Sequence, residues 1–273
     1  KMVAMKGSYH GKSMGALSLT FNPKYREPFQ PLVEKVSFSP YGDVNALHDV
    51  VDKDTAFVIL EPIQGESGIH VPPEGFLQEV RKICDENDSL LIFDEIQSGL
   101  GRTGSMWASE HWKTVPDIMC LAKGIAGGVP MGVTLVRPDI LAVMKKGEHS
   151  STFGGNPLAC AAGTATLHAL TQDGLIENAK SIGEKFSNGL EELKSKHPII
   201  REVRGKGLMI GVELKFEVKD ILMEGIKNGL LLLYSGRNIL RFLPPLVISE
   251  EDTVKTLQIL DKLLTNEENR RNA

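Results

Sequence analysis

The stretch LLIFDEIQ, residues 90–97, decides the fold class of this chain. Its first four residues are all apolar, and an acid follows them directly. Such a run is typical of a strand buried on both faces inside a parallel sheet. Five similar runs are further strand candidates, at residues 3–5, 33–38, 57–60, 118–121 and 132–136. Apolar residues at helical spacing between residues 76 and 84 separate two of these runs, so we predict an α/β fold, a mostly parallel sheet with flanking helices.

The pattern changes near Pro157, where an Ala-rich helix is predicted over residues 158–170. A second predicted helix, over residues 175–193, repeats apolar residues every three or four positions. Shorter strand and helix candidates follow, at residues 199–203, 208–214, 220–228, 230–233, 239–243 and from Ser249 onward. We therefore predict a large α/β domain over residues 1–171 and a smaller C-terminal α+β domain over residues 172–273.

The composition excludes several classes of protein. Lys and Arg number 31 and Asp and Glu 35, so the formal net charge is −4, without the basic excess typical of nucleic-acid binders. No apolar run approaches the roughly 18 residues that cross a membrane. Cys84, Cys120 and Cys160 are too far apart for a CxxC metal or redox site, and free thiols suit a reducing compartment. We expect a cytoplasmic protein with no metal and neither nucleic acid nor membrane as a partner.

Three charged residues, Glu61, Asp94 and Lys123, each follow the end of a different predicted strand. Ligands of parallel α/β proteins bind beyond the carboxyl ends of the strands, so we expect these side chains to converge there. Glycines close to Lys123 would let a flat ligand approach, and partial desolvation would lower the pKa of its amine and make it a nucleophile. The alternative, a solvent-facing lysine beside an acid that caps a helix, stays open on spacing alone.

Two glycine-rich segments have competing interpretations. Residues 99–104 fit the GxGxxG pattern, but five residues separate them from the preceding strand and the next strand leads to a lysine instead of an acid, so a dinucleotide-binding fold is disfavoured. Residues 149–156 combine hydroxyls and glycines just before the Ala-rich helix. That arrangement suits an anion such as phosphate, or forms an ordinary capped loop.

Taken together, the motifs of this chain resemble those of class III aminotransferases, in the order of that family. They are GSYHGKSMGALSLT (7–20), EPIQGE (61–66), LLIFDEIQSGLGRTG (90–104), LAKGIAGGVPMG (121–132), STFGGNPLA (151–159) and RFLPPLVI (241–248). The resemblance implies the fold-type-I transferase scaffold and pyridoxal 5′-phosphate as the cofactor. It is strongest to the branch that contains acetylornithine, ornithine and acetyl-lysine aminotransferases.

The resemblance also implies roles for residues around the cofactor. Lys123 would form the Schiff base and move the proton between the substrate carbon and the cofactor. Asp94 would pair with the pyridinium nitrogen, which lets the ring accept electrons. Gln97 would hydrogen-bond the phenolic oxygen, and Tyr9 would stack on the ring face. His10, beside Tyr9, would either support the ring or fill space.

Further implied roles concern the substrates and a second subunit. Arg241 would bind a substrate carboxylate in a bidentate manner, and Glu66 would mask this arginine when an ω-amino substrate is bound. Thr152 would reach the cofactor phosphate of the neighbouring subunit, so the active form would be a homodimer with shared active sites.

The activity implied is transfer of an ω-amino group from an acetylornithine-, ornithine- or lysine-type donor to a 2-oxo acid, 2-oxoglutarate, in arginine or lysine biosynthesis. One alternative is another class III enzyme, such as a 4-aminobutyrate-type aminotransferase, an aminomutase, a decarboxylase or a racemase. A second alternative is a catalytically inactive remnant that serves as a structural or dimerisation partner.

The chain departs from the family pattern in two places. Lys12 stands where this branch usually has an arginine that grips a substrate carboxylate. Members of the family also carry a preceding segment with a Gly-Thr/Ser loop that cradles the phosphate, and no such loop occurs in this sequence. We expect an N-terminally truncated chain that lacks the first strand of the sheet and half of the phosphate site.

Lysine keeps the positive charge at position 12 but loses the fork geometry of arginine, so we predict weaker carboxylate binding or an altered substrate. The variant Lys12→Arg is expected to lower the KM for a carboxylate-bearing substrate. Steady-state measurement of KM checks this, and unchanged constants for every substrate would contradict it.

Overall fold

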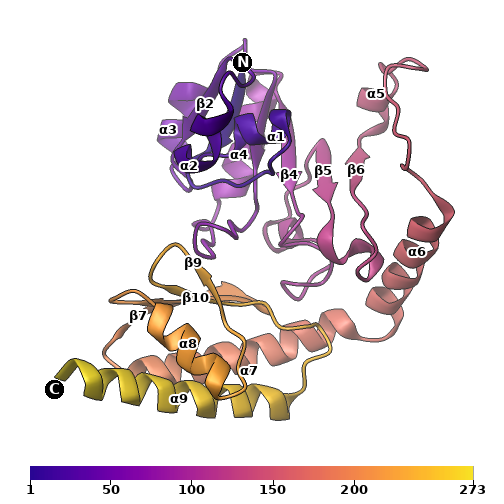
Figure 1. Ribbon diagram of the computed structural model, residues 1–273. Helices are drawn as coiled ribbons and strands as arrows, with labels where there is room; N and C mark the ends of the chain where they lie inside the picture. The colour runs from indigo at the N-terminus through magenta and orange to yellow at the C-terminus, as the bar shows by residue number, and fades with distance from the viewer. Residues whose placement is uncertain (273) are drawn as a thin grey trace.

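The computed structural model describes residues 1–272 and contains a six-stranded sheet in the order β2-β1-β3-β4-β5-β6 (Figure 1). The strands are β1 (Met2–Met5), β2 (Val36–Ser39), β3 (Phe57–Leu60), β4 (Leu90–Asp94), β5 (Ile118–Leu121) and β6 (Val133–Val136). Strands β1 to β5 pair in parallel, whereas β6 runs antiparallel to β5. The predicted α/β fold with a mostly parallel sheet is confirmed.

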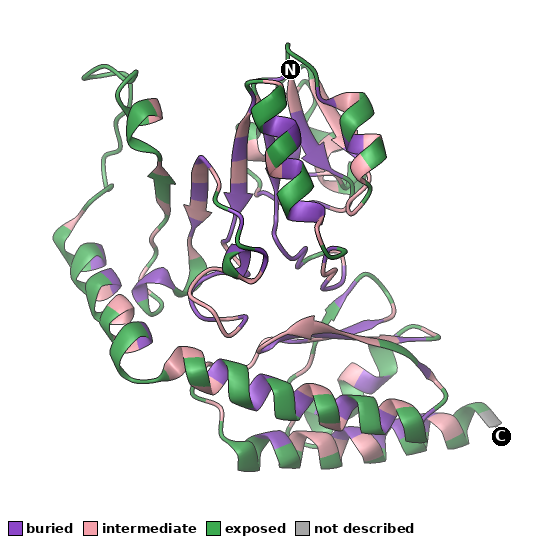
Figure 2. Cartoon of the chain, turned by 180° about the vertical axis from the view of Figure 1, so that it is seen from behind, coloured by how far each residue is buried: buried purple, intermediate pink, exposed green. Residues whose placement is uncertain are grey.

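Helices connect the strands of the six-stranded sheet, and some of them bury apolar residues against it. They are α1 (Met14–Leu19), α2 (Pro23–Arg26), α3 (Val44–Val50), α4 (Phe76–Glu86) and α5 (Pro138–Leu141), with short 3₁₀ helices η1 (Glu27–Phe29), η2 (Ala108–Trp112) and η3 (Lys123–Ala126). On α4, Phe76, Leu77 and Val80 are buried against a core that includes Leu91 and Phe93 of β4. Figure 2 shows this buried layer along the central strands.

A second sheet, of four antiparallel strands, follows in the order β7-β8-β10-β9. Its strands are β7 (Ile200–Lys206), β8 (Met209–Leu214), β9 (Leu233–Ser235) and β10 (Ile239–Phe242). Helices α7 (Leu175–Lys196), α8 (Lys219–Lys227) and α9 (Glu250–Asn272) lie together on one side of it (Figure 1). Its core includes Phe186 and Leu190 of α7 and Phe242 of β10. Helix α6 (Pro157–Gln172) leads into this region from the large sheet, and the division at residues 171–172 stays a proposal.

Two predicted strands start later in the structure than the sequence pattern indicated. The strand predicted at residues 33–38 is β2, which begins at Val36 because Lys35 has φ 59°, a left-handed conformation that interrupts extended backbone. The strand predicted at residues 230–233 is β9, which begins at Leu233. Leu231, counted as a strand residue because it is apolar, is 83% exposed and packs on neither sheet face.

Polar contacts to backbone carbonyls fasten the small sheet to the loops of the large sheet. Arg102 donates to the carbonyls of Leu208, at 3.3 Å, and of Pro244, and burial lowers the pKa of its guanidinium to about 10. Arg204 donates from Nε to the carbonyl of Gly68 at 2.9 Å. Gly207 has φ +52°, and a Cβ added to it would lie only 2.4 Å from the backbone carbonyl carbon of Thr103. These contacts fix the strand ends of the large sheet against β7–β10.

The core packing of β4 predicts a large cost for emptying it. Phe93 is fully buried, so Phe93→Ala is expected to lower the free energy of unfolding by about 3–5 kcal/mol, measured by urea denaturation. Val115 is 77% exposed, and Val115→Ala should change the free energy of unfolding by less than about 0.5 kcal/mol. Equal effects of the two substitutions would contradict the assigned core.

Candidate active site

A buried pair of side chains, Asp94 and His10, lies at the carboxyl edge of the six-stranded sheet. Asp94 is the last residue of β4, and His10 lies in the segment that follows β1. His10 Nδ1 is 2.8 Å from Asp94 Oδ2, and in the tautomer that carries a proton on Nδ1 the imidazole donates this bond. The other oxygen, Oδ1, accepts from the backbone N–H of Ile96 at 3.1 Å. Within residues 1–272, the buried His10 Nε2 has no hydrogen-bond partner.

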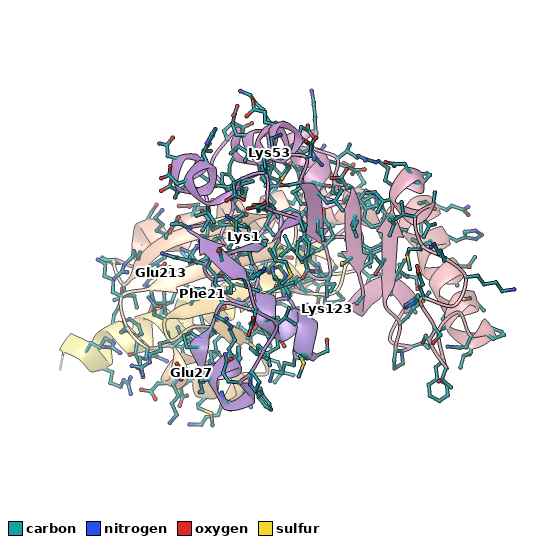
Figure 3. All side chains as sticks on the ribbon, turned by 90° about the horizontal axis from the view of Figure 1, so that it is seen from above. Lys1, Phe21, Glu27, Lys53, Lys123 and Glu213 are labelled. Carbon is teal, nitrogen blue, oxygen red and sulfur yellow. The ribbon has the colours of Figure 1, made fainter. Side chains whose placement is uncertain are left out.

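Lys123 begins η3, two residues after the end of β5, with φ 50°. Burial of its amine lowers the pKa of Lys123, although the charges of Asp94, Glu66 and Glu61 oppose this effect. Its side chain lines a cavity of about 660 Å³ together with Gln97, Gly124 and Gly127. Figure 3 labels Lys123 beside the strands of the large sheet, among side chains of several elements. The site therefore contains an amine with a lowered pKa near buried carboxylates.

Glu66 joins the two sheets through an ion pair. Its Oε1 lies 2.7 Å from Nη1 of Arg241 on β10 and also accepts from Gln97 Nε2 at 3.4 Å. Burial favours the neutral acid, but the hydrogen bond and charge of Arg241 overcome it and hold the pKa of Glu66 below its usual range. Gln97 lies directly over Gly65, where a Cβ would be 1.9 Å from Gln97 Oε1, so any side chain at this position would displace the Gln97 amide.

A second cavity, of about 590 Å³, lies on the other side of Glu66. It is lined by Tyr9, Tyr25, Glu66, Tyr234 and Arg241, with smaller polar residues between them. The rings of Tyr9 and Tyr25 meet edge to face, with centroids 5.9 Å apart. Burial and the charge of Glu66 raise the pKa of Tyr9, so its hydroxyl stays protonated. A guanidinium among aromatic rings suits a substrate that carries a carboxylate on an aliphatic chain.

Lys12 lines neither cavity but contacts Tyr25, and Thr152 lies apart from the site. Lys12 Nζ lies over the ring of Tyr25, 5.0 Å from its centroid, where a cation–π contact holds it. Thr152 is exposed in the segment between α5 and α6, which Figure 1 shows extending away from the strand ends. In the described part of the chain the structure therefore brings Tyr9, Glu66 and Arg241 together around the second cavity, and Gln97 and Lys123 around the first. Asp94 and His10 lie at the strand ends, and Gln97 reaches Glu66 through its amide, whereas Thr152 lies apart.

Three residues of the site were missed by sequence reasoning. Tyr25 and Tyr234 line the second cavity, and Ser235 Oγ donates to the backbone carbonyl of Glu66. The Asn-Pro pair before Tyr25 is a helix-start signal, and Asn22 does cap α2, but a four-residue helix has no periodicity that would assign a face. Tyr234 and Ser235 come from β9 and reach the site only because the small sheet folds against the loop that follows β3.

The described residues also lack some other kinds of site. No helix within residues 1–272 is long and apolar enough to cross a membrane. The same residues contain no group of three or more His, Cys, Asp or Glu side chains placed to hold a metal ion. Cys84, Cys120 and Cys160 are free thiols, and burial raises the pKa of Cys84 to about 12, so that thiol is not a nucleophile.

This chain belongs to the class-III aminotransferase family, whose model matches residues 1–264. It is 47% identical over 266 residues to the acetylornithine aminotransferase of Caldanaerobacter subterraneus subsp. tengcongensis, covering 97% of this chain and 67% of the relative. It is 41% identical to the [LysW]-aminoadipate semialdehyde/glutamate semialdehyde transaminase of Sulfolobus acidocaldarius, covering 99% and 70%.

Solved structures agree with this assignment. The ornithine aminotransferase of Toxoplasma gondii superposes with a TM-score of 0.95 at 35% identity, covering 99% of this chain and 66% of that one. Our chain therefore spans about two thirds of the length of the proteins it matches. The fold is that of the fold-type-I pyridoxal-phosphate transferases.

The site residues fit pyridoxal 5′-phosphate, the cofactor of this family. Asp94 supplies a buried carboxylate that a protonated ring nitrogen would satisfy, and Lys123 supplies an amine with a lowered pKa. Gln97 Oε1 is buried without a partner among residues 1–272, as expected of a group that binds a ligand. The glycines that line the cavity beside Lys123 leave room for a planar ring.

The electrostatic coupling of Asp94 and Lys123 can be measured directly. The negative charge of Asp94 raises the pKa of Lys123, so Asp94→Asn should lower this pKa further and enlarge the unprotonated fraction. At about pH 8, acylation of Lys123 in the protein without cofactor is expected to be a few-fold faster in the variant. Mass spectrometry gives the rate, with the exposed Lys146 as internal reference, and an equal or slower rate would contradict the coupling.

Proposed function

We propose that this chain carries the catalytic centre of a pyridoxal-phosphate-dependent aminotransferase. It would transfer an ω-amino group from an acetylornithine-, ornithine- or lysine-type donor to 2-oxoglutarate, in arginine or lysine biosynthesis. The observation that carries the proposal is the position of Asp94 and Lys123 at the ends of adjacent strands, beside the Glu66–Arg241 ion pair. The activities named for its relatives support the same reaction.

When bound, pyridoxal 5′-phosphate supplies a carbonyl that reacts with amines and a pyridinium ring that accepts electrons. Burial lowers the pKa of Lys123, which enlarges its unprotonated fraction, and this amine would attack the carbonyl and would take up and return the substrate proton. Asp94 would hold a proton on the ring nitrogen, and His10 would orient the Asp94 carboxylate through the 2.8 Å bond. Tyr9 would cover one ring face, and the Gln97 amide would bind the phenolic oxygen.

Glu66 and Arg241 give one site two substrate states. With an ω-amino donor, the ion pair stays closed, and the charge of Arg241 is neutralised. With glutamate or 2-oxoglutarate, the α-carboxylate takes the place of Glu66 on the guanidinium. The Glu66 side chain is 40% exposed, so it can swing aside into solvent at low cost. Two alternating carboxylate states suit transamination better than decarboxylation, racemisation or an aminomutase reaction.

A homodimer with shared active sites is part of the proposal. Thr152 is exposed and lies apart from Lys123 in this subunit, so it is available to the cofactor phosphate of a partner subunit. Lys12 would contribute its charge to substrate carboxylate binding from its place over Tyr25. The partners are then a small amino donor, a 2-oxo acid and a second copy of the chain, and a cytoplasmic location is part of the same proposal.

The proposal predicts a Lys123-dependent spectrum. Mixing the chain with pyridoxal 5′-phosphate is expected to give visible Schiff-base absorbance, which Lys123→Ala abolishes. Adding N-acetylornithine or ornithine should bleach this absorbance, and 2-oxoglutarate should restore it. Absence of the absorbance in the unsubstituted chain would favour the inactive remnant, and bleaching by 4-aminobutyrate alone would favour a 4-aminobutyrate-type aminotransferase.

A further inference from the structure

Glu61 is a buried carboxylate at the end of β3 whose two oxygens accept from two different segments of the site. Its Oε1 accepts from the backbone N–H of Tyr9 at 3.0 Å, and its Oε2 accepts from the backbone N–H of Gly65 at 2.9 Å. The residue is only 5% exposed. Glu61 forms no salt bridge with a lysine or arginine among residues 1–272, so the two backbone N–H groups and the nearby His10 are what favour its charged form.

The two segments held by Glu61 carry side chains from opposite sides of the site. Tyr9, on the segment after β1, lines the second cavity. Gly65 is the residue on which the Gln97 amide rests, and Glu66, the partner of Arg241, comes next in the chain. A small shift of the Tyr9 segment therefore moves the Tyr9 ring. A small shift of the Gly65 segment moves the Gln97 amide and the Glu66 carboxylate.

Fold stability alone does not explain why an acid is buried at position 61. Burial raises the pKa of Glu61 to about 7, and the nearby Asp94 charge adds to this effect while His10 and the two N–H donors oppose it. Keeping an acid ionised in such surroundings costs folding free energy. Buried acids with a shifted pKa are common at functional sites, where the placement of the surrounding groups outweighs the cost in folding free energy.

We propose that Glu61 is a positioning residue of the active site, whose carboxylate clamps the backbone of Tyr9 and Gly65 so that Tyr9, Gln97 and Glu66 keep the spacing that the cofactor and substrate require. Glu61 would act through these three residues and would not itself contact the cofactor or the substrate. The purpose of this positioning rests on the proposed function, but the two hydrogen bonds of the clamp are present in the protein without cofactor.

The clamp can be tested in the protein without cofactor through the variant Glu61→Gln. A glutamine has one acceptor oxygen and one NH₂ donor, so it satisfies at most one of the two N–H groups. Hydrogen–deuterium exchange at the amides of Tyr9 and Gly65 should accelerate, at one or both by about ten- to a hundredfold. Unchanged exchange at both amides would overturn the proposal.

Glu95 offers a matched control, because it is a fully buried glutamate at the end of the next strand. Glu95 accepts from the backbone N–H groups of Ala108, at 3.1 Å, and Ser109, at 2.8 Å. Both residues belong to η2, and neither lines either cavity. Glu95→Gln should accelerate exchange at these two amides and leave Tyr9 and Gly65 protected. Acceleration at Tyr9 and Gly65 in both variants would reduce the effect to general destabilisation and overturn the proposal.

A second readout separates the positioning role from a purely structural one. In Glu61→Gln, the dissociation constant for pyridoxal 5′-phosphate should rise about tenfold, and the circular dichroism of the bound cofactor should change, whereas Glu95→Gln should alter neither. Faster exchange without a change in cofactor binding or dichroism would overturn the positioning role. If the chain binds cofactor but transfers no amino group, the proposed function fails while the clamp, judged by exchange, still stands.

Discussion

The hydrogen bond between His10 and Asp94 is the contact on which the site depends. It joins the segment after β1 to the end of β4, across the intervening β3, and both side chains are buried. In such surroundings the Asp94 carboxylate cannot be solvated by water, so its imidazole and backbone partners determine where its charge sits. That charge opposes the lowering of the Lys123 pKa by burial and would face the ring of the cofactor.

The parallel sheet makes this arrangement predictable from sequence. Strands that are apolar on both faces must be buried, and the charged residues that follow them must therefore gather at one edge, so the pattern of residues predicts that Glu61, Asp94 and Lys123 converge. The roles expected of Asp94 and Lys123 came from the resemblance to the family. Tyr25, Tyr234 and Ser235 could not be found in this way. Their places follow from how α2 and the small sheet pack against the loops, and no local periodicity encodes that approach.

The small sheet acts on the site through charge and close backbone contact. Arg241 of β10 neutralises Glu66, and Ser235 of β9 binds the backbone of the same residue. Arg102 and Gly207 bring the two sheets close enough for these contacts to form. The small sheet thus supplies the guanidinium of Arg241, and the large sheet supplies the amine of Lys123.

We infer that Asp94 would keep the ring nitrogen of the cofactor protonated. The direct measurement is the nitrogen-15 NMR shift of pyridoxal 5′-phosphate labelled at its ring nitrogen and bound to the chain. We expect the shift of a protonated pyridinium with Asp94 present and the shift of a neutral pyridine in Asp94→Asn. The same shift in both proteins would contradict the account.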